Sequence, residues 1–352
     1  MAPRRPTISD VARSAGVSKG AVSFALNGRP GVAPETRDRI LAVAGELGWT
    51  PSHRARALAA SRALAVGLVI ARPPETLGAD PFFPAFIAGI ESALSPLGQS
   101  LLLQVVPDRE RELAGYRGLA ADGRVDGVFL TDLRVDDPRP ELLAEIGLPA
   151  IWVGPDCTDD SRPCVAVDDR PGIAAAVTHL VELGHRVIGH VAGPDEFVHG
   201  VSRREAWAAA LRAADLPEGP CVRSDFSAQG GADATKALLD LSAPPTAIVY
   251  ANDLMAIAGM AAAAARGLDV PRDLSITGFD DTEVSAHLQP PLTTVRTDAY
   301  TWGQAAAERL MATVEGRGAP NGTLPPPFLV VRASTAPPRI HLSQVRHETE
   351  HR

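Results

Sequence analysis

The sequence of 352 residues lacks the long apolar segment that a membrane span requires. No run approaches the roughly 18 consecutive apolar residues needed to cross a bilayer. The basic N-terminus is not followed by the apolar stretch that marks a secretory signal. We therefore expect a cytoplasmic protein that does not interact with a membrane.

Cysteine is also scarce, with three residues and no pair in a CxxC arrangement. An odd number of cysteines without such a pair disfavours both a disulfide framework and a zinc site. We therefore expect Cys157, Cys164 and Cys221 to be reduced thiols.

Motifs of catalysis are missing. The sequence contains no GxxxxGK[ST], no GxGxxG after the first predicted strand, and no GxSxG. Paired carboxylates occur at Asp168-Asp169 and at Asp280-Asp281. Neighbouring side chains on a strand or turn point apart, however, so these pairs do not suggest acid–base chemistry. We expect neither enzymatic activity nor a cofactor.

The first 27 residues predict two short helices joined by a tight turn. Thr7 is a good N-cap for the first helix, and Gly16 is a natural end because glycine tolerates left-handed dihedral angles. Ser18 caps the second helix. The outer face of that helix carries Lys19, Gly20, Ser23, Phe24 and Asn27. This pattern predicts a helix-turn-helix whose second helix can enter a major groove, although amphipathic helix pairs also occur in ordinary cores.

Charge is distributed unevenly along the chain. Residues 1–62 contain ten lysines and arginines and four acids, a net charge of +6. The remaining 290 residues contain 24 basic and 38 acidic side chains, a net charge of −14. A basic segment joined to an acidic body is typical of a module that binds nucleic-acid phosphates. A basic surface that meets only solvent is the alternative.

Two further helical segments follow. Pro34 suits a first helical turn, and the apolar stripe that begins at Ile40 can close a small three-helix core. Residues 52–62 are rich in Ala and Arg and too short to form a stable helix alone. Such a helix can form on DNA, where Leu58 would act as a wedge between base steps of the minor groove. An ordinary linker helix with Leu58 packed on the body is the alternative.

The body alternates predicted strands and helices, which indicates two successive βα series and hence two doubly wound parallel-sheet α/β lobes. In the first series we expect strands at 66–70, 100–106, 125–130 and 150–153; in the second, at 165–167, 187–191, 247–250 and 274–278. Ligands of such folds bind beyond the carboxyl ends of the strands. Asp132, Asn252 and Asp280 follow predicted strands, and Arg203 begins a helix after a loop. Together these groups suit a polyol such as a sugar.

From about Thr7 to about Ser334 the sequence resembles the lactose/galactose repressor (LacI/GalR) family of transcriptional regulators. The N-terminal matches are Asp10-Val11-Ala12, Gly16-Val17-Ser18, Val22-Ser23, Leu26-Asn27-Gly28, Glu35-Thr36-Arg37, Glu46-Leu47-Gly48-Trp49 and Ala55-Arg56-Ala57-Leu58. The matches in the body are Asp80-Pro81-Phe82-Phe83, Arg203-Arg204-Glu205-Ala206-Trp207, Tyr250-Ala251-Asn252-Asp253, Gly278-Phe279-Asp280-Asp281 and Pro290-Pro291-Leu292-Thr293-Thr294-Val295. The chain departs from the family at Ala21 and Phe24, where Thr and Arg are common.

The resemblance implies a homodimeric DNA-binding regulator, most often a repressor, controlled by a small molecule that is commonly a sugar. It implies base contacts by Lys19, Gly20 and Phe24. The implied phosphate contacts are Thr7, Ser18, Ser23, Asn27 and Arg37. Ala55 and Leu58 are the implied contacts of the hinge. The implied effector-binding residues are Phe82, Asp132, Arg203, Phe226, Asn252 and Asp280.

We expect a helix-turn-helix headpiece over residues 1–50, a hinge helix over 51–63, a core over 64–336 and a disordered tail over 337–352. Within the core, the first lobe takes about 64–163 and 293–325, and the second about 164–292 and 326–336. Two other classes remain open. A sugar-binding protein of the periplasmic type has a similar body but would need a signal peptide, and an α/β enzyme would need a catalytic motif.

Overall fold

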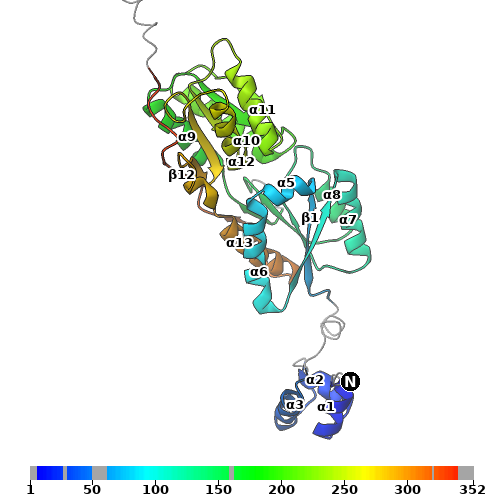
Figure 1. The fold of residues 1–352 in the computed structure, drawn as a ribbon. Helices are drawn as coiled ribbons and strands as arrows, with labels where there is room; N and C mark the ends of the chain where they lie inside the picture. Colours follow the sequence, from blue (N-terminus) through cyan, green and yellow to red (C-terminus); the bar gives the residue numbers. More distant parts are fainter. Residues whose placement is uncertain (1–5, 27–29, 50–61, 158–161, 319–320, 340–352) are drawn as a thin grey trace, which may run out of the picture.

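The computed structural model describes residues 6–26, 30–49, 62–157, 162–318 and 321–339 (Figure 1). The predicted hinge helix lies almost wholly outside these residues, together with Ala55 and Leu58. Asn27 and most of the predicted tail also lie outside them. No helix of the described part is long and apolar enough to span a membrane.

The described N-terminal residues form a bundle of α1 (Ile8–Ala15), α2 (Lys19–Leu26) and α3 (Pro34–Glu46). Each helix contributes a fully buried aliphatic side chain, Val11, Val22 and Ile40, to one apolar cluster. The start of α1 is fixed by the Asp10 carboxylate, which accepts hydrogen bonds from the backbone N–H and the hydroxyl of Thr7. The predicted helix-turn-helix is therefore present.

The first lobe contains a parallel sheet of six strands in the order β11-β5-β4-β3-β1-β2. Its strands are β1 (Ala65–Ala71), β2 (Ser100–Val106), β3 (Val128–Leu130), β4 (Ala150–Gly154), β5 (Cys164–Ala166) and β11 (Gly322–Thr323). The associated helices are α5 (Pro74–Ala79), α6 (Phe82–Leu94), α7 (Arg109–Ala121), α8 (Arg139–Glu145) and α13 (Ala299–Val314), with a 3-10 turn η1 (Ser95–Leu97). Helices α6 and α13 cover one face of the sheet, and α7 and α8 cover the other (Figure 1). This burial on both faces explains why β1 is a continuous apolar run.

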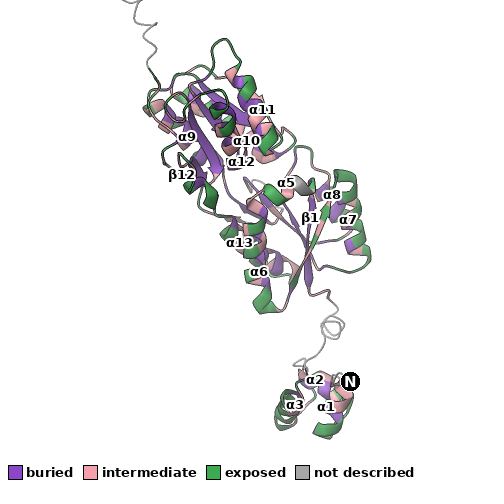
Figure 2. Cartoon of the chain, viewed as in Figure 1, coloured by how far each residue is buried: buried purple, intermediate pink, exposed green. Residues whose placement is uncertain are grey.

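The second lobe contains six strands in the order β12-β10-β9-β8-β6-β7, all parallel except β12. Its strands are β6 (Ile188–Ala192), β7 (Cys221–Arg223), β8 (Ala247–Tyr250), β9 (Ser275–Asp280), β10 (Thr293–Arg296) and β12 (Phe328–Val330). Its helices are α9 (Arg170–Glu182), α10 (Val198–Ala213), α11 (Ala228–Leu239) and α12 (Asp253–Ala264), with a 3-10 turn η2 (Glu283–Ala286). The central strands are buried beneath exposed helix faces (Figure 2). The two doubly wound lobes are therefore confirmed.

The two lobes are connected in a way that differs from the expected boundaries. Strand β5 pairs with β4 in the first lobe, although we expected the second lobe to begin at about residue 164. Strand β10 pairs with β9 in the second lobe, although we expected the return to the first lobe at about residue 293. At these two points the chain crosses one strand later than expected, because an apolar strand segment does not specify which neighbour it pairs with.

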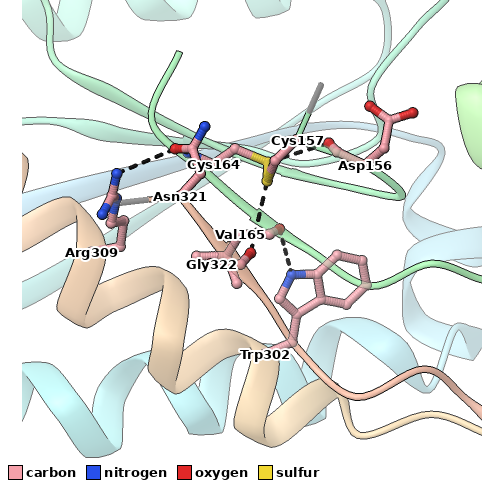
Figure 3. The surroundings of a disulfide bond; sticks show 8 residues. All are labelled: Asp156, Cys157, Cys164, Val165, Trp302, Arg309, Asn321 and Gly322. Atoms are coloured by element: carbon pink, nitrogen blue, oxygen red, sulfur yellow. Dashed lines mark hydrogen bonds between the residues drawn. A yellow bond between two sulfur atoms is a disulfide. The ribbon is translucent and has the colours of Figure 1, made fainter. Parts of the chain in front are cut away.

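The prediction that all cysteines are reduced is wrong for two of them. Cys157 and Cys164 form a disulfide, with their Cα atoms 5.7 Å apart (Figure 3). Cys164 belongs to β5, which pairs with β4, and Cys157 lies just past the end of β4. Strand pairing thus brings together two cysteines seven positions apart, which spacing alone does not reveal. Cys221 is a free, exposed thiol.

Candidate functional site

A cleft between the lobes lies at the carboxyl ends of both sheets. Its walls are formed by Arg72, Asp80, Phe82, Thr131, Asp132, Leu133, Val153, Gly154, Pro155, Asp169, His199, Arg203, Phe226, Asn252, Asp280, Thr297 and Trp302. The cavity enclosed is about 80 Å³, whereas small-molecule sites typically measure about 300–1,000 Å³. We therefore expect the lobes or their side chains to move apart when a ligand of that size binds.

The residues predicted for an effector all line this one cleft. The first lobe contributes Phe82, at the start of α6, and Asp132, after β3. The second lobe contributes the other four, Arg203, Phe226, Asn252 and Asp280. They come from α10, the loop before α11, the start of α12 and the end of β9. The fold thus brings together side chains as far apart as 82 and 280 in the sequence.

Three of these residues have a left-handed or related backbone conformation that side chains rarely adopt. The φ angle is 47° at Asp132, 66° at Phe226 and 124° at Asp280. Each costs of order 1–3 kcal/mol, and such positions concentrate at functional sites. The cleft therefore stores backbone strain in the residues that project their side chains into it.

Asn252 fixes the geometry of the cleft with both ends of its amide. Its Oδ1 accepts a hydrogen bond from the N–H of Met255 at 2.9 Å and so caps α12. Its Nδ2 donates to the carbonyl of Phe226 at 3.0 Å. Asn252 therefore holds the Phe226 loop in place, and each end of its amide keeps one further hydrogen-bonding position for a ligand.

Arg203 is held by groups on three sides. Its Nε donates to the carboxylate of Asp169 at 2.7 Å, and one of its terminal nitrogens donates to the carbonyl of Ala251 at 2.7 Å. Its guanidinium carbon lies 3.7 Å from the centre of the Phe279 ring. This stacking and pairing fixes the plane of the guanidinium.

Arg72, Asp169 and His199 also line the cleft but were not predicted, and Asp80 lines it as part of the same sequence match as the predicted Phe82. Arg72 directly follows β1, so the rule that found Asp132 at the end of its strand also applies to it. Its Nε and one terminal nitrogen donate to the two carboxylate oxygens of Asp132, both at 2.6 Å. The other terminal nitrogen donates to Asp80 at 2.8 Å. The structure thus adds a buried ion-pair triad to the predicted site.

Burial and charge shift the pKa values of the titratable groups in the cleft. Burial raises the pKa of Asp280 well above its usual value, and the neighbouring Asp253 raises it further. Burial likewise raises the pKa of Asp80, despite the opposing effect of Arg72. Burial acts on Asp132 in the same direction, but the Arg72 guanidinium beside it brings its pKa below the usual value. Burial and the charge of Arg203 lower the pKa of His199 to about 3, so this imidazole is neutral near pH 7.

The headpiece presents the predicted DNA-facing residues to different degrees. Lys19 and Gly20 are exposed on α2, and Phe24 is 42% exposed on the same helix. Ser23 and Arg37 are partly buried. Thr7 and Ser18 serve as caps, since Ser18 Oγ accepts a hydrogen bond from the N–H of Ala21 at 3.1 Å. Helix α2 therefore has an exposed face that can approach a duplex.

No group of three or more potential metal ligands is found within the described residues. The chain offers instead an exposed helix face at its N-terminal domain and a charged, strained cleft in its core.

Comparison with known proteins finds a family match for the N-terminal domain and another for the core. Residues 7–52 match the family described as bacterial regulatory proteins, lacI family, and residues 177–335 match a periplasmic binding protein-like domain. The regulator CelR of Thermobifida fusca is 36% identical over 318 residues, which cover 89% of this chain and 93% of CelR.

Solved structures agree. A CelR–cellobiose complex has a TM-score of 0.73 at 33% identity, over 94% of this chain and all of that one. The Lac repressor dimer bound to operator and the anti-inducer ONPF has a TM-score of 0.80 at 30% identity, over 95% of this chain and all of that one.

The headpiece, the two-lobed core and these likenesses define a helix-turn-helix transcriptional regulator and not an enzyme. The chain belongs to the LacI family of bacterial transcriptional regulators.

Proposed function

We propose that this regulator is a cytoplasmic homodimeric repressor whose DNA binding is controlled by a sugar held between the two lobes. The observation that carries the effector site is the convergence of Phe82, Asp132, Arg203, Phe226, Asn252 and Asp280 on one cleft. Sugars are recognised by aromatic faces together with carboxylate, amide and guanidinium groups, which this set provides. The solved CelR complex contains cellobiose, which supports a sugar here.

The DNA-binding role is assigned to particular residues of the headpiece and hinge. Lys19, Gly20 and Phe24 face base edges. Thr7, Ser18, Ser23, Asn27 and Arg37 contact phosphates, and Ala55 and Leu58 of the hinge reach the minor groove. The exposure of the α2 face supports the first group. We keep the headpiece at 1–50, the hinge at 51–63, the core at 64–336 and the tail at 337–352.

Lobe closure links the two sites. Two backbone hydrogen bonds cross the cleft: Val135 N–H donates to Glu196 at 3.0 Å, and Val198 N–H donates to Leu133 at 2.8 Å. A ligand that changes these contacts changes the angle between the lobes, and through the hinge it shifts the population that is competent for DNA.

The test is fluorescence anisotropy with a labelled duplex from the protein's own promoter, titrated with and without cellobiose, maltose, trehalose and glucose. Arg203→Ala should abolish the response to the active sugar, because Arg203 organises the second-lobe wall of the cleft. Arg212→Ala, on an exposed turn of the same helix, is the matched control and should respond like the unmodified protein. A response that survives in a folded Arg203→Ala protein would contradict the effector site.

A further inference from the structure

We propose that Arg72, fixed between Asp80 and Asp132, makes the cleft selective for an uncharged hydroxyl-bearing ligand over its phosphorylated or carboxylated counterparts. The inference rests on the proposed function, since it specifies the class of ligand that the same cleft accepts. Its basis is the state of the two guanidinium groups in the cleft walls.

Arg72 is already neutralised. It is 6% exposed, and its fork binds both oxygens of Asp132 at 2.6 Å while a third N–H reaches Asp80 at 2.8 Å. The other oxygen of Asp80 accepts a hydrogen bond from the N–H of Phe82 at 3.0 Å, which fixes that carboxylate to the start of α6. Two anchored carboxylates therefore share the one positive charge of Arg72.

Aromatic rings surround the Arg72 guanidinium. Its guanidinium carbon lies 5.4 Å from the ring centres of Phe83 and Phe197 and 5.9 Å from that of Phe226. Phe197 and Phe226 belong to the second lobe, so the side chain is enclosed from both sides of the cleft. Turning away from Asp132 would leave that buried carboxylate without its partner, which is strongly unfavourable.

The second cation is occupied in a similar way. Arg203 pairs with Asp169, which is 3% exposed, and lies against the ring of Phe279. Both guanidinium groups of the cleft wall are therefore engaged by carboxylates of the same wall.

Carboxyl groups outnumber guanidinium groups in the wall of the cleft. Among the described residues that line the cleft, two arginines face four aspartates, Asp80, Asp132, Asp169 and Asp280. No ion pair within the described part of the chain reaches Asp280. Burial in the cleft disfavours negative charge and so raises the pKa values of Asp80, Asp169 and Asp280.

A phosphate or carboxylate entering this cleft would lose its hydration without gaining a free cation. An uncharged hydroxyl group is suited to the same surroundings. It can donate a hydrogen bond to the carboxyl group of Asp280, whereas an ionised phosphate or carboxylate has no proton to donate there. The cleft therefore favours an uncharged ligand over its anionic counterpart.

Isothermal titration calorimetry with matched sugars tests this selectivity. The probes are glucose with glucose 6-phosphate and glucuronate, trehalose with trehalose 6-phosphate, and cellobiose with cellobionate. In the pair that contains the binding sugar, we expect the uncharged member to bind at least 100-fold more tightly than its anionic counterpart. An anionic member that binds as tightly as, or more tightly than, the neutral one overturns the inference and leaves the effector site standing. If no probe binds or changes DNA binding, the proposed function fails and the inference fails with it.

The substitution Asp80→Asn tests whether the neutralisation of Arg72 causes this selectivity. The substitution removes one of the carboxylates that neutralise Arg72 while keeping the side chain's size, so the preference for the neutral sugar should fall about tenfold. Asp240→Asn, at an exposed ion pair with Arg266 far from the cleft walls, should leave the preference unchanged. Circular dichroism and DNA binding without sugar confirm that each variant is folded. An unchanged preference in folded Asp80→Asn protein would overturn the role of Arg72.

Discussion

Asp280 lies at the end of β9 with its carboxyl group in the cleft and its backbone at a φ of 124°. Burial raises its pKa well above the usual value, with Asp253 and Asp80 acting in the same direction and Arg203 against them. The native state therefore holds this proton more tightly than the unfolded chain does. The contribution of Asp280 to stability is fully present below its unfolded pKa and is lost as the pH rises through the native pKa.

The sign of this linkage predicts the effect of Asp280→Asn. The amide cannot ionise, and asparagine tolerates positive φ values about as well as aspartate does. We expect a higher Tm than the unmodified protein at pH 7–8 and a gain that shrinks as the pH falls toward 4. The measurement is thermal unfolding at several pH values without sugar, with Asp240→Asn, at an exposed position, as the control. A gain that grows as the pH falls would contradict the assignment.

Arg139 shows how one buried side chain supports the site from behind. It is 1% exposed and pairs with Glu112 at 2.8 Å and Asp137 at 2.6 Å. It also donates to the carbonyls of Thr131 and Asp132, both at 3.0 Å, and so holds the strained turn that carries the Asp132 carboxylate.

Removing this guanidinium leaves buried acceptors without a donor. We expect Arg139→Met to lower the free energy of unfolding by about 3 kcal/mol. Arg111→Met, at an exposed position of α7, should stay within about 0.5 kcal/mol. Urea unfolding measures the free energy of unfolding of both variants. Equal small decreases would show that the buried ion pairs and hydrogen bonds of Arg139 contribute little to stability.

At the scale of elements, helices α6 and α13 pack unusually close. A Cβ atom at Gly89 would lie 2.0 Å from the carbonyl oxygen of Tyr300, and one at Gly303 would lie 2.1 Å from that of Phe86. Both contacts are with backbone, which cannot turn aside. The two glycines therefore permit the first lobe to be closed by a helix that arrives from the far end of the chain.

This contact predicts opposite effects for two chemically identical substitutions. Gly303→Ala should push the helices apart and lower the free energy of unfolding by about 1–3 kcal/mol. Gly118→Ala, on the exposed face of α7 with no atom within 4 Å of the added carbon, should raise it by about 0.5–1 kcal/mol. Chemical denaturation of the two variants measures their free energies of unfolding. A neutral or stabilising effect of Gly303→Ala would contradict the close packing.

Most helices and strands can be predicted from the local sequence pattern. The elements against which they pack cannot. The predicted strand at 100–106 agrees with β2 to the residue. Helix α13 was not predicted, although Ala306, Ala307 and Leu310 recur at helical spacing. Its function as a cover for the first lobe depends on α6, more than 200 positions away, which single-sequence periodicity does not reveal.

The candidate site was likewise predictable from the sequence only in part. Strand-end positions identify Asp132 and Asp280 because sheet geometry brings such residues together. The same rule reaches Arg72, but its pairing with Asp132 requires β1 and β3 to be neighbours, a matter of strand order. The disulfide between Cys157 and Cys164 likewise depends on the pairing of β4 with β5.

At the scale of the molecule, control of DNA binding depends on a hinge between the headpiece and the core. Leu58 falls outside the described residues, and its role as a wedge is a prediction from sequence. Removing an intercalating side chain should weaken binding to the specific duplex roughly tenfold, of the order of 1.4 kcal/mol, and leave sugar affinity unchanged. Leu97→Ala, at an exposed leucine of the core, is the control for Leu58→Ala in a gel-shift titration. If the two variants bind the specific duplex with equal affinity, Leu58 does not act as a wedge.

The central claim is that a basic N-terminal domain binds duplex DNA and responds to a ligand in a cleft of the acidic core. Anisotropy titration of the purified protein with a duplex from its own promoter, at low ionic strength and with each sugar probe, tests it most directly. We predict tight binding that weakens steeply with salt and changes at least fivefold with one uncharged sugar. Affinity no greater than for an unrelated duplex, under every sugar condition, would contradict the account.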